Sequence, residues 1–149
     1  MNLNKLASEC RKYAESEQNR EFNLEGACHE NAIGSAEHIR NNTDYTPLIV
    51  WGYVQRSGTD EEPSNIEETE EKGQTHFWVK IKENEKIIDI CPVNRHDFKT
   101  GLNPSKPYCG DLPEDYGSVK EFYYEGWMTP ADLASKSSFN LISSRIQEP

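Results

Sequence analysis

The sequence predicts an α+β domain in which N-terminal helices pack against an antiparallel β-sheet. Two segments near the N-terminus have apolar residues at helical spacing, and several later segments have the composition or the alternation of strands. A chain of 149 residues is long enough for one domain with a substantial core and too short for two. We therefore expect a single domain that spans residues 1–149.

The two N-terminal segments are expected to be helices. Residues 3–18 place apolar side chains on one stripe and charged side chains off it, as in a helix that packs on a core. Residues 28–40 repeat this pattern, since Cys28, Ala32 and Ala36 recur at every fourth position. Turn-forming residues follow directly and are expected to end the second helix.

Four segments are expected to form strands. The run 47–55 is apolar without interruption and rich in β-branched and aromatic residues, which predicts a strand buried on both faces. Residues 74–82 alternate between apolar and polar, and residues 86–92 follow a charged turn as the partner strand of a hairpin. The last strand is expected at 119–124, after an irregular segment at 94–117 that contains prolines and glycines.

An acidic loop is expected to be inserted in the domain at about residues 56–73. This segment holds seven acidic residues, Pro63 and two glycines, which predicts a solvated and irregular backbone. Near the C-terminus, Thr129 and Pro130 have the cap-and-proline form of a helix start, and this helix is expected to continue to about Ser135.

The net charge limits the classes of partner. At −10, the chain has too few cations to favour contact with the phosphates of nucleic acid or with an anionic membrane. No apolar run has membrane-spanning length, and the first residues lack the apolar core of a signal peptide, so a cytoplasmic protein is expected. The four cysteines include no CxxC pair, which indicates neither a zinc ribbon nor a disulfide framework.

Cys28 is the first candidate for a reactive group. It falls in or just before the first turn of the predicted second helix, and Gly26 permits a tight backbone turn before it. Unpaired N–H groups and the positive end of the helix dipole favour the thiolate there, which is the nucleophilic form of cysteine. The alternative is that Cys28 is a small apolar residue of the core.

His76 and Asp89 are the next candidates, because each is a polar residue within an apolar strand. They are 13 positions apart, and residues at odd separation share one face of a hairpin whose loop has even length. If the turn is centred between residues 82 and 83, the two lie directly opposite each other. If it is centred one residue later, they share the face but are displaced along the strands. A three-residue loop would put them on opposite faces.

These three residues match the needs of nucleophilic catalysis. A cysteine nucleophile needs a histidine to take its proton, and the histidine needs a carboxylate to hold its tautomer. Cys28, His76 and Asp89 are therefore predicted to be nucleophile, base and orienting acid. The backbone N–H of Cys28 is expected to stabilise an oxyanion. Candidates for a second oxyanion donor are Gln18, Asn23 and Asn31.

The same residues carry a resemblance to known enzymes. A cysteine at a helix start, His-x-Trp-Val at 76–79 and an apolar strand with Ile-Asp-Ile at 88–90 together resemble the transglutaminase-like branch of the papain-like thiol enzymes, whose catalytic order is Cys, His, Asp. Gly-x-Cys-x-Glu-Asn at 26–31, with the Thr-His pair at 75–76, also resembles the arylamine N-acetyltransferases, which share that core. Over residues 24–93, the resemblance implies a papain-like, transglutaminase-like core and the same three catalytic roles.

The predicted function is a cysteine-dependent hydrolase or acyltransferase that acts on an amide, peptide or thioester bond through an acyl-enzyme at Cys28. The expected substrate is a peptide, a protein or a small amide, and no cofactor or metal is expected. Trp78 shares the predicted face of His76 and is expected to line the substrate cleft. His29 follows the thiol in sequence but is expected to point away from it, in a surface or capping role.

Two other interpretations remain open. Cys28, His76 and Cys91 would together offer ligands for zinc, although their spacing matches no metal motif. Alternatively, the chain has a papain-like fold and is a non-catalytic module that only binds a protein partner. Metal content tests the first interpretation, and the reactivity of the thiol tests the second.

Overall fold

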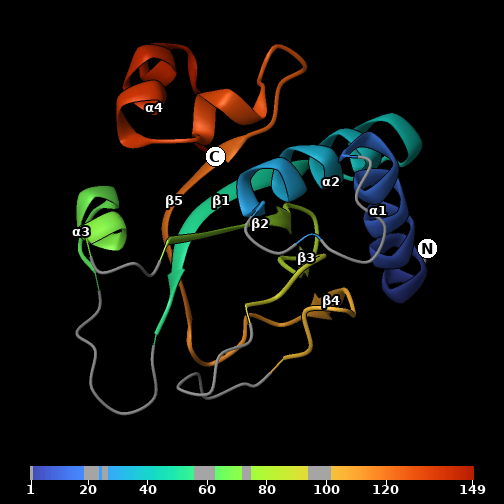
Figure 1. Cartoon of the computed structure of the whole chain (residues 1–149). Coiled ribbons are helices and arrows are strands. Elements are labelled where there is room, and N and C mark those ends of the chain that lie inside the picture. The colour runs from blue at the N-terminus through green and yellow to red at the C-terminus, as the bar shows by residue number, and fades with distance from the viewer. Residues whose placement is uncertain (1, 19–23, 25–26, 56–62, 72–74, 94–101) are drawn as a thin grey trace.

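The computed structural model describes residues 2–18, 24, 27–55, 63–71, 75–93 and 102–149 (Figure 1). Two long helices precede a sheet, and short helical turns follow it. In chain order, the elements are α1 (Leu3–Gln18), α2 (Cys28–Asn42), β1 (Pro47–Val54), α3 (Ile66–Glu71), β2 (Thr75–Ile81), β3 (Ile87–Asp89), β4 (Tyr108–Gly110), β5 (Tyr116–Tyr123), the 3-10 turn η1 (Pro130–Leu133), α4 (Lys136–Ile142) and the 3-10 turn η2 (Ser143–Arg145).

The strands form one sheet of five, in the order β4-β3-β2-β1-β5, and every neighbouring pair is antiparallel. β1 lies between β2 and β5, and all eight of its residues are buried. This is expected of an unbroken apolar run, because alternate side chains of an interior strand pack into opposite faces of the sheet. The predicted α+β class with an antiparallel sheet is therefore confirmed.

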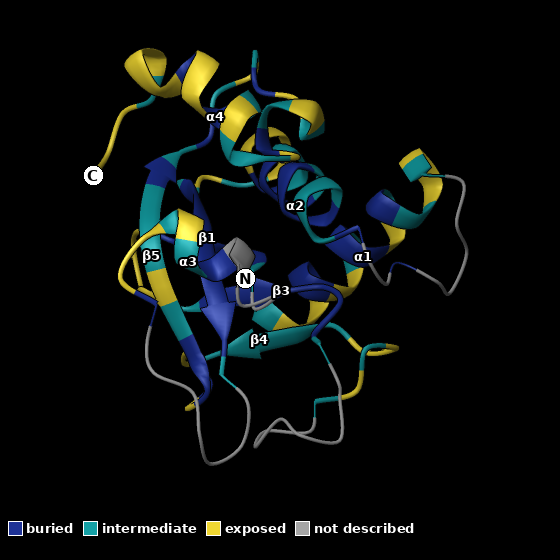
Figure 2. Ribbon diagram, turned by 60° about the vertical axis from the view of Figure 1, so that its left-hand side comes forward, coloured by how far each residue is buried: buried dark blue, intermediate teal, exposed yellow. Residues whose placement is uncertain are grey.

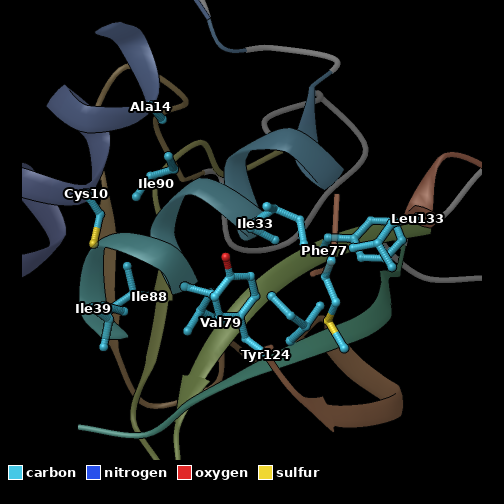
Figure 3. Close-up of a cluster of buried hydrophobic side chains, with 14 of the residues drawn as sticks. Cys10, Ala14, Ile33, Ile39, Phe77, Val79, Ile88, Ile90, Tyr124 and Leu133 are labelled. Carbon is cyan, nitrogen blue, oxygen red and sulfur yellow. The ribbon is translucent and has the colours of Figure 1, made fainter. Parts of the chain in front are cut away.

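The main core lies between the sheet and the two long helices. α2 packs on β1 and β2, and α1 packs beside α2 and reaches β4 (Figure 1). Phe77 and Val79 of β2 point into this core together with Ile33 of α2 (Figure 3). Figure 2 shows β1 buried along its length, since a second cluster covers its other face. That second cluster consists of Val50, Val54, Trp78, Ile87 and Tyr116.

Gly52 of β1 permits a close approach of neighbouring groups. A Cβ atom at this position would clash with the carbonyl oxygen of Gly117 and with the ring of Trp78. The register between β1 and β5 also shifts here, between Trp51 and Gly52. A larger residue would therefore force β1 away from β5 or displace the Trp78 ring.

Arg11 ties α1 to the chain that follows the β2–β3 hairpin. Its Nη1 atom donates to the carbonyl oxygens of Ile90 at 2.7 Å and Pro104 at 2.6 Å. Its Nε atom donates to Glu15 at 3.1 Å. A buried guanidinium needs such partners, because an unsatisfied charge in the interior is costly. Through these bonds, α1 holds the backbone directly after Asp89.

Two of the predicted strands have different bounds. β3 ends at Asp89 and not at residue 92, because a side-chain oxygen of Asp89 accepts the N–H of Cys91 at 3.2 Å and the backbone turns out of the ladder. β5 begins at Tyr116 and not at residue 119, since it pairs with the far end of β1. The segment 94–117 was expected to be irregular, but β4 lies within it and pairs with β3.

The expectation of an irregular acidic loop at 56–73 is wrong for its second half. α3 forms there, and the side chain of Asn65 accepts the N–H of Glu68 at 2.9 Å at its start. Residues 56–62 and 72–73 lie outside the described residues. Nearer the C-terminus, the predicted helix start at Thr129 has a capping box, but the helix is a 3-10 turn that ends at Leu133. No helix in the described part of the chain has the length and apolar character needed to cross a bilayer.

Candidate active site

Cys28 is the first residue of α2 and is half-buried. The residue before it, Ala27, caps the helix without a side-chain hydrogen bond. The first N–H groups of a helix have no partner within the helix, so this end of α2 presents free donors and a positive dipole to the thiol. The predicted position of Cys28 at a helix start is therefore confirmed.

His76 and Asp89 face each other across the hairpin. The turn is centred one residue later than the position that would place His76 directly opposite Asp89. This follows from the register, in which Val79 pairs with Ile88 and Lys80 with Ile87. The two side chains accordingly share a face but are displaced along the strands, and long side chains bridge such a diagonal. The Nε2 atom of His76 lies 2.7 Å from the Oδ2 atom of Asp89, and both side chains are only 3% exposed.

Asp89 is held by two further donors. The hydroxyl of Tyr116 donates to the same Oδ2 atom at 2.7 Å, and the N–H of Cys91 donates to Oδ1 at 3.2 Å. Burial raises the pKa of Tyr116, and the neighbouring Asp89 raises it further, so the phenol stays protonated as a donor. A buried carboxylate needs such partners. Sequence reasoning missed Tyr116, which lay in a segment expected to be irregular.

The ring of His76 bridges Asp89 and the thiol. Because Nε2 bonds the carboxylate, its proton is assigned there, and Nδ1 is the nitrogen left for Cys28. Burial raises the pKa of Cys28, but hydrogen bonds and charge from His29 and His76 outweigh burial and lower that pKa from 9.0 to about 6. Burial lowers the pKa of His76, whereas Asp89 and Cys28 raise it, and the net direction is upward. Both shifts favour the thiolate–imidazolium form of the pair over the neutral form.

His29 also contacts the thiol, which corrects the expectation that it points away. Hydrogen bonding with Cys28 raises the pKa of His29, partial burial lowers it, and the charges of Cys28 and Glu30 raise it further. Both residues begin α2, where side chains tilt toward the N-terminal end of the helix. Because of this tilt, the side chains of Cys28 and His29 meet at the N-terminal end of the helix. The expectation considered only the directions of side chains around the helix axis, in which neighbouring residues diverge.

A cleft of about 410 Å³ opens beside the thiol. Its walls come from α2, β1, β2 and the turn between η1 and α4. The residues that line it are Cys28, His29, Trp51, Thr75, Phe77, Leu133, Ala134 and Ser135. The indole Nε1 atom of Trp51 is buried and has no hydrogen-bond partner in the described part of the chain. A larger hollow at the other end of α2, lined by residues 41–45, contains neither cysteine nor histidine.

Trp78, predicted to contact substrate, has a different position. It is 2% exposed, and its ring lies 5.0 Å from that of Tyr116 and 5.9 Å from that of His76. It belongs to the second core cluster and is not among the residues that line the cleft. Successive residues of β2 point to opposite faces of the sheet, so Trp78 shares the face of His76 and lies opposite Phe77. The aromatic residues that line the cleft are Trp51 and Phe77.

The proposed second oxyanion donors are engaged elsewhere. The Nε2 atom of Gln18 donates to Asn31 at 2.8 Å, and the Nδ2 atom of Asn31 donates to the carbonyl oxygen of Leu24 at 3.1 Å. Neither residue lines the cleft, and Asn23 lies outside the described residues. These two amides connect α1, α2 and the segment between them, so their role in the described structure is to position the start of α2.

The zinc interpretation gains no support from the described residues. They include no group of three His, Cys, Asp or Glu side chains arranged to hold a metal ion, and this covers Cys28, His76 and Cys91. Comparison with models of known protein families, with curated proteins and with solved structures finds no match for this chain. Any assignment of chemistry therefore rests on the geometry of the site.

Proposed function

We propose that this protein is a cysteine-dependent hydrolase or acyltransferase that acts on an amide, peptide or thioester bond through an acyl-enzyme at Cys28. The observation that carries the proposal is the buried His76–Asp89 pair, 2.7 Å apart, whose free imidazole nitrogen serves a thiol of lowered pKa at a helix start. A helix start, a strand and a paired strand supply the three groups in the order of the papain-like, transglutaminase-like enzymes. We propose that core for this fold.

The first half of the reaction is attack by the Cys28 thiolate on the substrate carbonyl carbon. The new S–C bond moves the carbonyl electrons onto oxygen. We propose that N–H groups at the start of α2, which have no side-chain cap, bind that oxyanion. Collapse expels the leaving group, which takes a proton from an imidazolium beside the sulfur, and an acyl-enzyme remains. Water or an amine then attacks the thioester and gives a proton back to that imidazole, and the sulfur–carbon bond breaks to release Cys28 as thiolate.

The cleft favours a neutral acyl group. Its walls include the side chains of Trp51, Phe77 and Leu133, and besides Cys28 and His29 its polar side chains include those of Thr75 and Ser135. No Asp, Glu, Lys or Arg is among its described lining residues.

We place the activity in the cytoplasm, because all four cysteines are free in the structure and a reducing compartment keeps a catalytic thiol active.

The test is the rate at which iodoacetamide alkylates Cys28 as a function of pH, followed by mass mapping of each modified cysteine. Cys109 is a matched internal control, because it is also half-buried and burial raises its pKa. We expect alkylation of Cys28 to reach half its plateau near pH 6, as its pKa implies, whereas Cys109 reacts only in alkaline solution.

Two variants complete this test. His76→Ala removes the imidazole that joins Asp89 to Cys28, and His76→Gln keeps a group that can still bond Asp89 if the alanine variant does not fold. In either variant, the alkylation midpoint of Cys28 is expected to move to higher pH, because only His29 then remains to lower the pKa of the thiol. If wild-type Cys28 already reacts like Cys109, the catalytic proposal fails and a binding module on this fold becomes the better interpretation.

A further inference from the structure

His29 differs from His76 in its access to substrate. Both rings interact with the Cys28 sulfur, but the side chain of His29 is 27% exposed and lines the cleft, whereas that of His76 is 3% exposed. His76 is not among the residues that line the cleft. A bound substrate therefore meets His29 directly, and it meets His76 only across the sulfur atom.

The two nitrogen atoms of His76 are already committed. Nε2 bonds Asp89 at 2.7 Å, and Nδ1 is left for Cys28. To protonate a leaving group, this buried ring would have to release its bond to the thiolate and turn toward the cleft. Within the described residues, the carboxylate nearest to His29 is that of Glu30, which is partly exposed and lies 3.9 Å from Nε2 through its Oε1 atom.

We infer that His29 is a second catalytic histidine, which exchanges protons with the leaving group and the acyl acceptor while the His76–Asp89 pair keeps Cys28 as thiolate. This inference rests on the proposed acyl transfer and divides its acid–base work between two rings. This division of roles fits the positions of the two rings. His76 is buried beside the carboxylate of Asp89, whereas His29 borders the space that substrate would fill.

The proton balance closes within one turnover. In acylation, the sulfur–carbon bond forms, the bond from carbon to the leaving group breaks, and the imidazolium of His29 gives its proton to the departing atom. In deacylation, neutral His29 takes a proton from the attacking water or amine, the sulfur–carbon bond breaks, and the thiolate returns. His76 stays protonated throughout, so it is the counter-ion of the thiolate at the start and at the end.

The charges around His29 favour its protonated form in the resting site. The negative sulfur of Cys28 adjoins the ring on one side, and the carboxylate of Glu30 lies on the other. The remaining residues of the cleft are neutral. Hydrogen bonding with the thiolate raises the pKa of His29, partial burial lowers it, and both negative charges raise it, so the net shift of the pKa favours the protonated ring.

The test uses aryl acetates, which share one acyl group and differ only in how much the leaving group needs a proton. Acetylation of Cys28 by 4-nitrophenyl acetate and by phenyl acetate is followed by intact mass in wild type and in His29→Gln. Each rate is divided by the thiolate fraction at that pH, measured from iodoacetamide alkylation. His38→Gln, on the same helix but outside the cleft, is the matched control.

Per thiolate, we expect His29→Gln to lose far less of its acetylation rate with 4-nitrophenyl acetate than with phenyl acetate, because 4-nitrophenolate departs without a proton. With phenyl acetate we expect a loss of about 10²-fold, the usual contribution of a general acid. The acetylated variant should also hydrolyse more slowly and accumulate. Added imidazole should restore part of the activity of His29→Ala and none of that of His76→Ala, because only the first substitution opens into the cleft.

Three outcomes decide the matter. Equal losses for the two esters in His29→Gln would show that His29 only supports the thiol, and the inference would be overturned. The same leaving-group dependence in His38→Gln would also overturn it, because the effect would then not be specific to the cleft. Failure of wild-type Cys28 to be acetylated by 4-nitrophenyl acetate would instead remove the proposed acyl transfer, whichever histidine is present.

Discussion

The two sides of the Cys28 sulfur differ in how they are built. On the buried side, His76, Asp89 and Tyr116 form a chain of hydrogen bonds of 2.7 Å between side chains that are almost inaccessible to solvent. On the open side, His29 and the cleft walls leave a space of about 410 Å³. The difference teaches that the pKa of the nucleophile is lowered from two directions, by His76, which lies outside the cleft lining, and by His29, which borders the space that substrate would fill.

Asp89→Asn is the largest expected disruption of the buried side. Asparagine keeps the shape but removes the charge that stabilises protonated His76, so the thiolate loses its counter-ion. We expect acetylation of Cys28 by 4-nitrophenyl acetate at pH 7 to fall about 10²-fold or more. The decisive comparison is with Asp111→Asn, whose carboxylate is exposed and pairs with Lys86. Equal rates in the two variants would mean that the buried pair does not activate Cys28.

The pH dependence of alkylation is the next largest effect. With a pKa of about 6, the thiolate fraction of Cys28 should fall about tenfold between pH 7 and pH 5. The expected result is a plateau above pH 7 and a tenfold lower rate at pH 5, measured by mass mapping. A rate that still rises between pH 8 and pH 9 would contradict the lowered pKa.

The same shift affects stability, with a definite sign. The pKa of Cys28 is lower in the folded chain than its ordinary value of 9.0, so the thiolate stabilises the fold above that value and this contribution is lost as the pH falls through about 6. Urea unfolding of wild type and Cys28→Ala should therefore diverge more at pH 8 than at pH 5. A constant difference between the two would show that Cys28 is not ionised in the fold.

Tyr116→Phe sharpens the comparison without breaking the pair. It removes one donor to Asp89 and leaves the ring packed on Trp78, so we expect a loss of about 1–2 kcal/mol in the free energy of unfolding. We also expect the alkylation midpoint of Cys28 to shift by a few tenths of a pH unit at most. Tyr123→Phe is the control, because that hydroxyl accepts a bond from Lys82 at the surface. Equal losses in both variants would deny Tyr116 a role in holding Asp89.

Thr75→Val perturbs only the open side and should have the smallest effect. The hydroxyl of Thr75 lines the cleft and bonds Thr69 of α3 at 2.9 Å, so its removal should cost about 1 kcal/mol or less. The alkylation profile of Cys28 should not change, whereas the concentration of aryl acetate needed for half-maximal acetylation should. A shifted alkylation midpoint would show that the two sides of the sulfur are coupled.

Periodicity was sufficient to predict the buried side in outline. The long alternation of β2 located His76, and a lone carboxylate in an apolar run located Asp89. Tyr116 was not predictable in this way, because it begins β5 in a stretch with glycine and serine, where no apolar alternation marks the strand. Its pairing depends on contact with β1, which is distant in sequence.

The open side was largely beyond sequence reasoning. Its walls come from four separate elements, and no local pattern shows that Trp51 of β1 and Ser135 near α4 border the same space. α3 was missed because six residues of mostly acidic sequence have no apolar periodicity; a cap at Asn65 and the bond of Thr69 to Thr75 support it. Trp78 was expected to line the substrate cleft but lies in the second core cluster. The sequence shows that Trp78 shares a face of the sheet with His76, but it does not show that other side chains bury that face.

The bonds of Arg11 have a consequence for the order in which the chain folds. They join α1 to Ile90 and Pro104, which are 79 and 93 positions away. Contacts of such separation form late, because the intervening loops must close first. These bonds hold the backbone directly after Asp89 only when α1 has docked on Ile90 and Pro104. If Cys28 is activated as we propose, a partly folded chain would carry it as an ordinary thiol, and its reactivity toward iodoacetamide would report the docking of α1.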